Sequence, residues 1–263
     1  MEWAAYLGIG AIVGFAAGLL GIGGGVVMVP LLVLVFTAHQ MPAAHVLHLA
    51  LGTALAAMVF TSLSSMRAHH AHGAVDWKIA RAMSPGILVG SFGAALLAGL
   101  IPTRPLAVLF TALVFYAATQ ILLDLKPSTM RELPGLAGIF AAGTVIGAIS
   151  SLLAAGGAFM TIPFLAWCRV PLRRAIGTAA ANGLPIAIAG TAGYVLHGMR
   201  VPDLPAPSLG YVYLPALALV VTTSMVAAPL GARLAHRLPI KQLRTLFALL
   251  LYVFAIRMLV GLW

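Results

Sequence analysis

The sequence is poor in charge and in cysteine, and both shortages narrow the class of protein. Only 8% of the 263 residues are charged, and aspartate and glutamate together number five. A soluble domain carries about 25% charged residues, so this chain cannot cover a globular surface with polar groups. Because Cys168 is the single cysteine, a scaffold held by internal disulfides is excluded.

The chain is instead rich in apolar residues, at 62% of the total with a mean hydropathy of +1.08. These values predict an all-α polytopic membrane protein, because apolar runs of about 20 residues span a bilayer as helices. The net charge of +10 does not indicate nucleic-acid binding, since the basic residues lie in short loops between apolar runs. The N-terminal segment also lacks the basic region of a cleavable signal peptide.

Eight apolar stretches account for most of the chain. Six have the length of a full crossing, namely residues 45–66, 82–100, 105–123, 175–196, 211–235 and 242–262. The other two, residues 4–36 and 134–167, are too long for one crossing, since about 33 helical residues extend about 50 Å. Small residues interrupt each of them, and the piece after the interruption is only half a crossing. We therefore expect two re-entrant helical hairpins that enter the membrane, break and return.

The distribution of basic residues supports this arrangement. If both long stretches return to the side they entered from, twelve loop lysines and arginines lie on one side and only Arg104 and Arg200 on the other. If each stretch crosses once, the two sides receive six and eight. The positive-inside rule therefore favours the hairpins, with both termini outside the cytoplasm. Two short full crossings in place of each hairpin would give the same sidedness, so charge does not separate these alternatives.

The two interrupted stretches also resemble each other. Residues 14–32 align with residues 147–165 without gaps, and Gly52-Thr53-Ala54 matches Gly177-Thr178-Ala179. Each half then holds one glycine-broken hairpin and three crossings. Because three is odd, the second half enters from the opposite side, which predicts an inverted-topology repeat, as in many secondary transporters. The repeat divides a single membrane domain into residues 1–126 and 127–263.

The interruptions are the candidate substrate site, because inverted-repeat transporters bind substrate near the midplane, where helices are discontinuous. Freed backbone N–H groups and the N-terminus of the following helix attract an anion. Close helix packing would explain one glycine run, but two related runs favour a site. The hydroxyls of Thr53 and Thr178 could instead bond helix carbonyls, and Asn182 could join helices. The predicted substrate-binding residues are Gly21, Gly23, Gly24, Gly25, Thr53, Gly156, Gly157, Thr178 and Asn182.

Other polar residues within or beside the apolar runs have simpler explanations. Arg257 could attract an anion, but only six residues follow it, which favours a side chain that reaches the interface. His48 is expected at the interface, and His69, His70 and His72 are expected in a solvated basic loop rather than a metal site. We expect neither a metal nor a cofactor.

The motif Leu19-Leu20-Gly21-Ile22-Gly23-Gly24-Gly25, a short apolar run to Pro30, and the later Gly52-Thr53 and Gly177-Thr178 resemble the sulfite exporter TauE/SafE family. The resemblance covers essentially the whole chain, although the second copy of the motif, residues 154–158, has fewer glycines. It implies a bacterial inner-membrane transporter that exports small sulfur-containing anions, sulfite or organosulfonates. The expected partners are therefore a small anion and the lipid bilayer, while a homo-oligomer stays an open alternative.

All five acidic residues lie at helix ends or in loops, which disfavours proton coupling through a carboxylate within the membrane. The preferred mechanism is alternating access with an anion held between the two hairpin tips. A channel for small solutes and a membrane assembly subunit that transports nothing are the alternatives. An enzyme is not expected, because no catalytic constellation appears within the spans.

Overall fold

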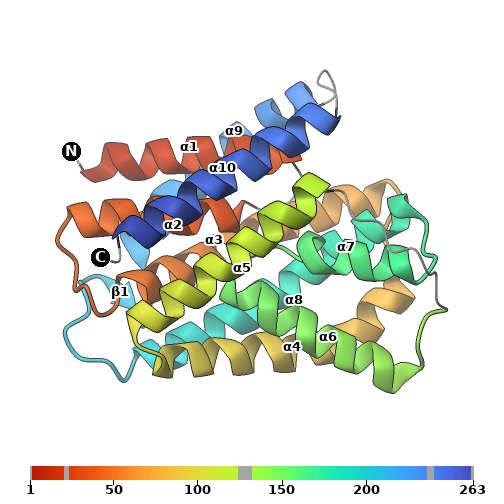
Figure 1. Cartoon of the computed structure of the whole chain (residues 1–263), viewed down its shortest axis with the longest axis horizontal. Helices are drawn as coiled ribbons and strands as arrows, with labels where there is room; N and C mark the ends of the chain where they lie inside the picture. The colour runs from red at the N-terminus through yellow and green to blue at the C-terminus, as the bar shows by residue number, and fades with distance from the viewer. Residues whose placement is uncertain (1, 21–23, 124–131, 236–239, 262–263) are drawn as a thin grey trace.

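The computed structural model describes residues 2–20, 24–123, 132–235 and 240–261, and these ranges are almost entirely helical (Figure 1). Within them, the strands β1 (Ser208–Leu209) and β2 (Val212–Tyr213) form one short antiparallel ladder. The all-helical membrane protein predicted from composition is confirmed. The helices are α1 (Glu2–Leu20), α2 (Gly25–Ala38), α3 (Val46–Ala71), α4 (Trp77–Leu100), α5 (Thr103–Leu123), α6 (Leu136–Leu152), α7 (Ala158–Trp167), α8 (Leu172–Gly198), α9 (Leu214–Ala235) and α10 (Ile240–Gly261).

Four helices of the described ranges are long and apolar enough to cross a membrane, namely α3, α4, α5 and α8. They coincide with four predicted crossings, and α3 extends further, so that His69 and His70 lie in its last turn rather than in a loop. The helices α9 and α10 coincide with the other two predicted crossings. The stretch predicted to begin at Tyr211 becomes helical only at Leu214, because the chain first forms β2.

Each of the two over-long stretches forms a pair of helices joined at a break. Gly24 precedes α2 with a φ of +69°, in the left-handed region that glycine adopts readily. Between α6 and α7, Ala154 has a φ of +48°. Figure 1 shows α1 and α2 starting and ending at one end of the bundle, and α6 and α7 at the opposite end. With 14 and 10 residues, α2 and α7 are each too short to cross a bilayer.

Helices from the two halves pack in pairs through close glycine contacts. The helix α1 lies against α9, and α6 lies against α4. A Cβ atom added at Gly14 would lie 2.5 Å from the carbonyl oxygen of Ser224 in α9. In the other pair, a Cβ atom added at Gly147 would lie 2.5 Å from the carbonyl oxygen of Ile87 in α4. Glycine thus permits the same close backbone approach in both pairs, as small residues do between membrane helices.

The helices α3 and α8 form the centre of the bundle and pack against each other. The short helix α2 packs on α3, and the short helix α7 packs on α8. On the outside of this central group, α5 packs on α10. Gly24, before α2, and residues 154–157 of the second break are buried. Their backbone is therefore covered by protein rather than by lipid, as non-helical backbone within a membrane requires.

Candidate functional site

The structure brings the two helix breaks into contact. A Cβ atom added at Gly25, the first residue of α2, would lie 2.0 Å from the carbonyl oxygen of Ala154 in the second break. Gly24, Gly25 and Ala154 are all buried. We call this contact the hairpin junction. The predicted site residues Gly21 and Gly23 lie outside the described residues.

The second break also lies against α8. Gly156 and Gly157 are buried, and a Cβ atom at Gly157 would lie 2.4 Å from the carbonyl oxygen of Ala179 and 3.0 Å from the amide nitrogen of Gly183. Asn182 is next to Gly183 on the same helix, so the predicted residues Gly156, Gly157 and Asn182 belong to one region. Glycine is required there because any side chain would separate α7 from α8.

Buried polar atoms without partners occur on the three helices that meet at the second break. Ser150 of α6 and Thr161 of α7 are fully buried, and their hydroxyl groups make no hydrogen bond within the described ranges. Asn182 of α8 is fully buried as well. Its Nδ2 donates only to the sulfur of Met83 at 3.5 Å, and its Oδ1 has no partner there. Leaving such a group unpaired costs about 1–3 kcal/mol, so these atoms indicate a polar interior at this depth.

Thr53 and Thr178 make equivalent hydrogen bonds to distant loops. The hydroxyl oxygen of Thr53 in α3 accepts from the backbone N–H of Tyr213 at 3.0 Å, just before α9 begins. The hydroxyl oxygen of Thr178 in α8 accepts from the backbone N–H of Asp76 at 3.0 Å, just before α4 begins. Each threonine therefore holds the start of a helix from the other half, a partner that no local sequence pattern indicates.

The glycine that precedes each threonine allows this approach. A Cβ atom at Gly52 would lie 2.4 Å from the carbonyl oxygen of Tyr211, and one at Gly177 would lie 2.3 Å from the carbonyl oxygen of Ala74. We call each Gly-Thr pair with its loop a loop clamp. The two matching Gly-Thr motifs therefore make equivalent contacts, each with a loop from the other half of the chain.

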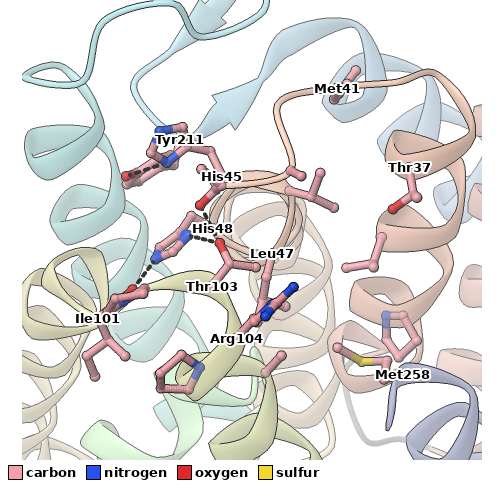
Figure 2. A pocket seen from close by; sticks show the side chains of 18 of the residues that line it. Thr37, Met41, His45, Leu47, His48, Ile101, Thr103, Arg104, Tyr211 and Met258 are labelled. Carbon is pink, nitrogen blue, oxygen red and sulfur yellow. Dashed lines mark hydrogen bonds between the residues drawn. The ribbon is translucent and has the colours of Figure 1, made fainter. Parts of the chain in front are cut away.

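A cavity of about 1030 Å³ lies at the end of the bundle where α1 begins and α10 ends (Figures 1 and 2). Its walls come from α2, the start of α3, the turn from α4 to α5, and α10. Its charged lining residues are Arg104 and Arg257, and no acidic residue of the described ranges lines it. Most of the remaining wall is apolar. We call it the Arg104 cavity. Its lining along α2 reaches Pro30, five residues and thus about 7.5 Å of helix from the hairpin junction.

His48 fixes the wall of the Arg104 cavity that holds Arg104. It is buried, and its Nε2 lies 3.1 Å from the carbonyl oxygens of both Ala98 and Ile101 (Figure 2). Because carbonyl oxygens only accept, Nε2 carries a proton and donates. The hydroxyl of Thr103 donates to the carbonyl of Ala44. These bonds tie the start of α3 to the turn from α4 to α5, directly beside Arg104.

A stack of aromatic rings closes the neighbouring wall. Tyr211 stacks on the ring of His48, with centroids 5.0 Å apart, and on the ring of His197, with centroids 5.9 Å apart. Its hydroxyl lies 3.4 Å from Nδ1 of His45. The rings therefore hold the loop before α9 against the start of α3. In the part of the chain that the structure describes, no group of His, Cys, Asp or Glu side chains could hold a metal ion.

Sequence reasoning did not single out the Arg104 cavity. It placed His48 at the interface, and it favoured an interfacial position for Arg257, which the structure places in the cavity lining. One signal was present, since Arg104 is one of only two loop cations on the side with few positive charges. A cation retained against the positive-inside bias is a reason to look for an anion site.

Comparisons with known proteins identify the family of this chain. The model of the family described as sulfite exporter TauE/SafE matches residues 6–258. A probable membrane transporter protein of Haemophilus influenzae is 36% identical over 252 residues, which is 95% of each chain. The probable membrane transporter protein YdhB of Bacillus subtilis is 30% identical, over 87% of this chain and 88% of its own. No solved structure gives a significant match. With nearly its whole length matched, this chain belongs to the sulfite exporter TauE/SafE family of multi-pass membrane transporters.

Proposed function

We propose that the protein is a secondary transporter that exports small sulfur-containing anions, sulfite or organosulfonates, across the bacterial inner membrane. The family supplies the substrate class. The observation that carries the proposed binding site is the hairpin junction, where two helix breaks touch inside the protein close to the buried amide of Asn182, whose Oδ1 has no partner in the described ranges. Discontinuous helices that meet in this way are the usual substrate site of inverted-repeat transporters.

The amide of Asn182 suits an anion at this position. Within the described ranges, its Nδ2 group donates only to a thioether sulfur, which is a weak acceptor. A sulfite or sulfonate oxygen is a stronger acceptor, and a charge-assisted hydrogen bond to it is about twice as strong as a neutral one. The hydroxyl of Thr161 and the backbone N–H groups freed at Gly156 and Gly157 are further donors in the same region. The hydroxyl protons of Thr53 and Thr178 stay available, because both oxygens act as acceptors in the loop clamps.

We propose that the chain is an inverted-topology repeat, with residues 1–126 and 127–263 as its halves and with both termini outside the cytoplasm. The paired contacts support this proposal. The close contact of Gly14 with α9 corresponds to that of Gly147 with α4. The loop clamp of Thr53 corresponds to that of Thr178. The two hairpins open toward opposite ends of the bundle in Figure 1. Rocking of one half against the other would then expose the hairpin junction alternately to each side.

An anion leaves an inside-negative cell with a favourable electrical contribution of about 2.3 kcal/mol per charge per 100 mV. Export therefore needs no carboxylate relay within the membrane, which agrees with the positions of the five acidic residues. The proposed cycle binds the anion from the cytoplasm at the hairpin junction, occludes it, and releases it outside.

Flux measurements on purified protein test this proposal. Proteoliposomes are loaded with sodium sulfite, and efflux is followed with Ellman's reagent; sodium sulfoacetate is tested by competition. We expect saturable efflux from the wild-type protein. In Asn182→Leu, efflux falls about tenfold or more, because a hydrogen bond to a charged group contributes about 1.5–3 kcal/mol. The unfolding temperature of this variant should be unchanged or higher, since a buried amide whose Oδ1 has no partner in the described ranges has been removed.

Thr111→Val is the matched control. Thr111 also carries a buried hydroxyl without a partner in the described ranges, but it lies on α5, away from the hairpin junction. This variant should keep wild-type efflux. Unchanged efflux in Asn182→Leu would refute the junction as the binding site, and no efflux of any anion by the wild-type protein would refute the transport function itself.

A further inference from the structure

We propose that the Arg104 cavity is a second anion-binding site, separate from the hairpin junction, in which Arg104 and Arg257 hold a small sulfonate or oxyanion. The position of this site on an export path rests on the proposed function, whereas the binding itself does not. The two arginines come from neighbouring helices that pack against each other, because Arg104 is in the first turn of α5 and Arg257 is near the end of α10.

The charge of the cavity is unbalanced. Among the residues that the structure describes, two guanidinium groups and no carboxylate line it, and the only ion pair joins Arg174 to Asp76 elsewhere. Both arginines are exposed, so their guanidinium groups are accessible to a small anion that enters from solution. Two positive charges at one cavity raise the local concentration of such anions. Arginine presents several N–H donors in a planar fork that matches a sulfonate or sulfite group with two parallel hydrogen bonds.

The wall beside Arg104 is built to hold its position. His48 uses its Nε2 proton on the carbonyls of Ala98 and Ile101, and Thr103 uses its hydroxyl proton on the carbonyl of Ala44. The donors of these two side chains therefore bond backbone carbonyls of the protein, and they fix the turn that carries Arg104 (Figure 2). The starts of α3 and α5 also face this cavity, and the partial positive charge of each helix N-terminus adds to the attraction for an anion.

The rest of the lining favours an anion with a short carbon chain. Apart from the arginines and the polar groups already bonded to the protein, the wall consists mainly of residues such as Val33, Leu34, Leu47, Phe254 and Met258. The volume of about 1030 Å³ is at the upper end for a small-molecule site, so one short organosulfonate does not fill it. Apolar contact should therefore make sulfoacetate bind more tightly than sulfate, although both present the same type of oxygen to the arginines.

Isothermal titration of the full-length protein in detergent with sodium sulfoacetate, sulfite and sulfate, at constant ionic strength, tests the proposal. The variants are Arg104→Gln and Arg257→Gln, with Arg104→Lys as the variant that keeps the charge. Each Gln variant should weaken sulfoacetate binding by about tenfold or more, since it removes a charged hydrogen-bond partner. The Lys variant should retain part of the affinity. Thermal unfolding of each variant shows whether it is folded.

Arg200→Gln is the matched control, because Arg200 is exposed, follows the end of α8, and does not line the cavity. It changes the net charge equally and should leave binding within about twofold of wild type. If all three Gln variants weakened sulfoacetate binding equally, the change in net charge alone would explain the loss, and the proposal would be overturned. Unchanged binding in both Arg104→Gln and Arg257→Gln would overturn it as well.

A second experiment separates this site from the transport function. Asn182→Leu should lower flux about tenfold or more but keep sulfoacetate binding in the Arg104 cavity. In proteoliposomes, Arg104→Gln should raise KM for an anion supplied on the Arg104 side, with kcat and with KM on the opposite side preserved. If no variant or wild-type protein transports any anion while Arg104→Gln still loses binding, the cavity site stands and the proposed function fails.

Discussion

Replacing Gly52 by alanine tests the loop clamp most directly. The added Cβ atom would lie 2.4 Å from the carbonyl oxygen of Tyr211, whereas ordinary contact begins at 3.4 Å. The loop before α9 must therefore retreat by about 1 Å, and overpacking of this kind costs about 1–3 kcal/mol. Alanine is the better helix former by about 1 kcal/mol, which offsets part of this cost. We expect a net destabilisation of about 1–2 kcal/mol.

The measurement is thermal unfolding in detergent, followed by tryptophan fluorescence at one fixed scan rate. For a chain of this size, 1 kcal/mol corresponds to about 2–4 °C, so Gly52→Ala should lower Tm by about 2–8 °C. Gly93→Ala in α4 is the control, because nothing lies within 4 Å of its added Cβ atom. That variant gains helix propensity without a clash and should raise Tm slightly.

The coupling between Gly52 and Thr53 provides a second test of the same clamp. Retreat of the loop also stretches the 3.0 Å hydrogen bond from the Tyr213 N–H to Thr53. Gly52→Ala and Thr53→Val should therefore be less than additive in a double-mutant cycle, since each damages the same contact. A Tm of Gly52→Ala equal to or above wild type, or full additivity in the cycle, would refute the clamp.

Three further outcomes follow from single contacts. Thr178→Val leaves the backbone N–H of Asp76 without its acceptor and should cost about 1–3 kcal/mol, whereas Thr178→Ser should restore most of the loss in thermal unfolding. Gly24→Ala places a side chain at a φ of +69° and should destabilise by about 1–2 kcal/mol, in contrast to the gain expected at an ordinary helical glycine. Burial raises the pKa of the Cys168 thiol. N-ethylmaleimide should therefore react with Cys168 more slowly at neutral pH than with a cysteine peptide, and the rate should increase as rising pH forms the thiolate. A reaction as fast as that of the peptide would contradict this expectation.

Much of the fold could be predicted because a bilayer imposes simple rules on a sequence. Apolar length located α3, α4, α5 and α8, and the two over-long runs located the pairs α1–α2 and α6–α7. The matching glycine motifs indicated where the helices break. Element ends were less accurate: α3 extends beyond its apolar run to Ala71, and α9 begins only at Leu214 because the chain first forms β2.

The candidate site was only partly within reach of such rules. Local composition marked Gly25 and Gly157 as break residues, but it could not indicate that Gly25 would lie against Ala154. It marked Thr53 and Thr178 as polar residues within spans, yet their partners are 160 and 102 residues away in the chain. The Arg104 cavity left almost no local signal, because its walls come from five separate segments.

The sequence by itself determined that the chain is a helical membrane protein, which stretches form long apolar helices, and which two stretches are broken, because hydrophobic length and glycine act locally. Only the tertiary structure decided which backbone carbonyl each glycine faces, which loop each threonine holds, and which two arginines share a cavity. Those pairings depend on helix packing between distant segments, and packing is decided by the shapes of all the helices together rather than by any one of them.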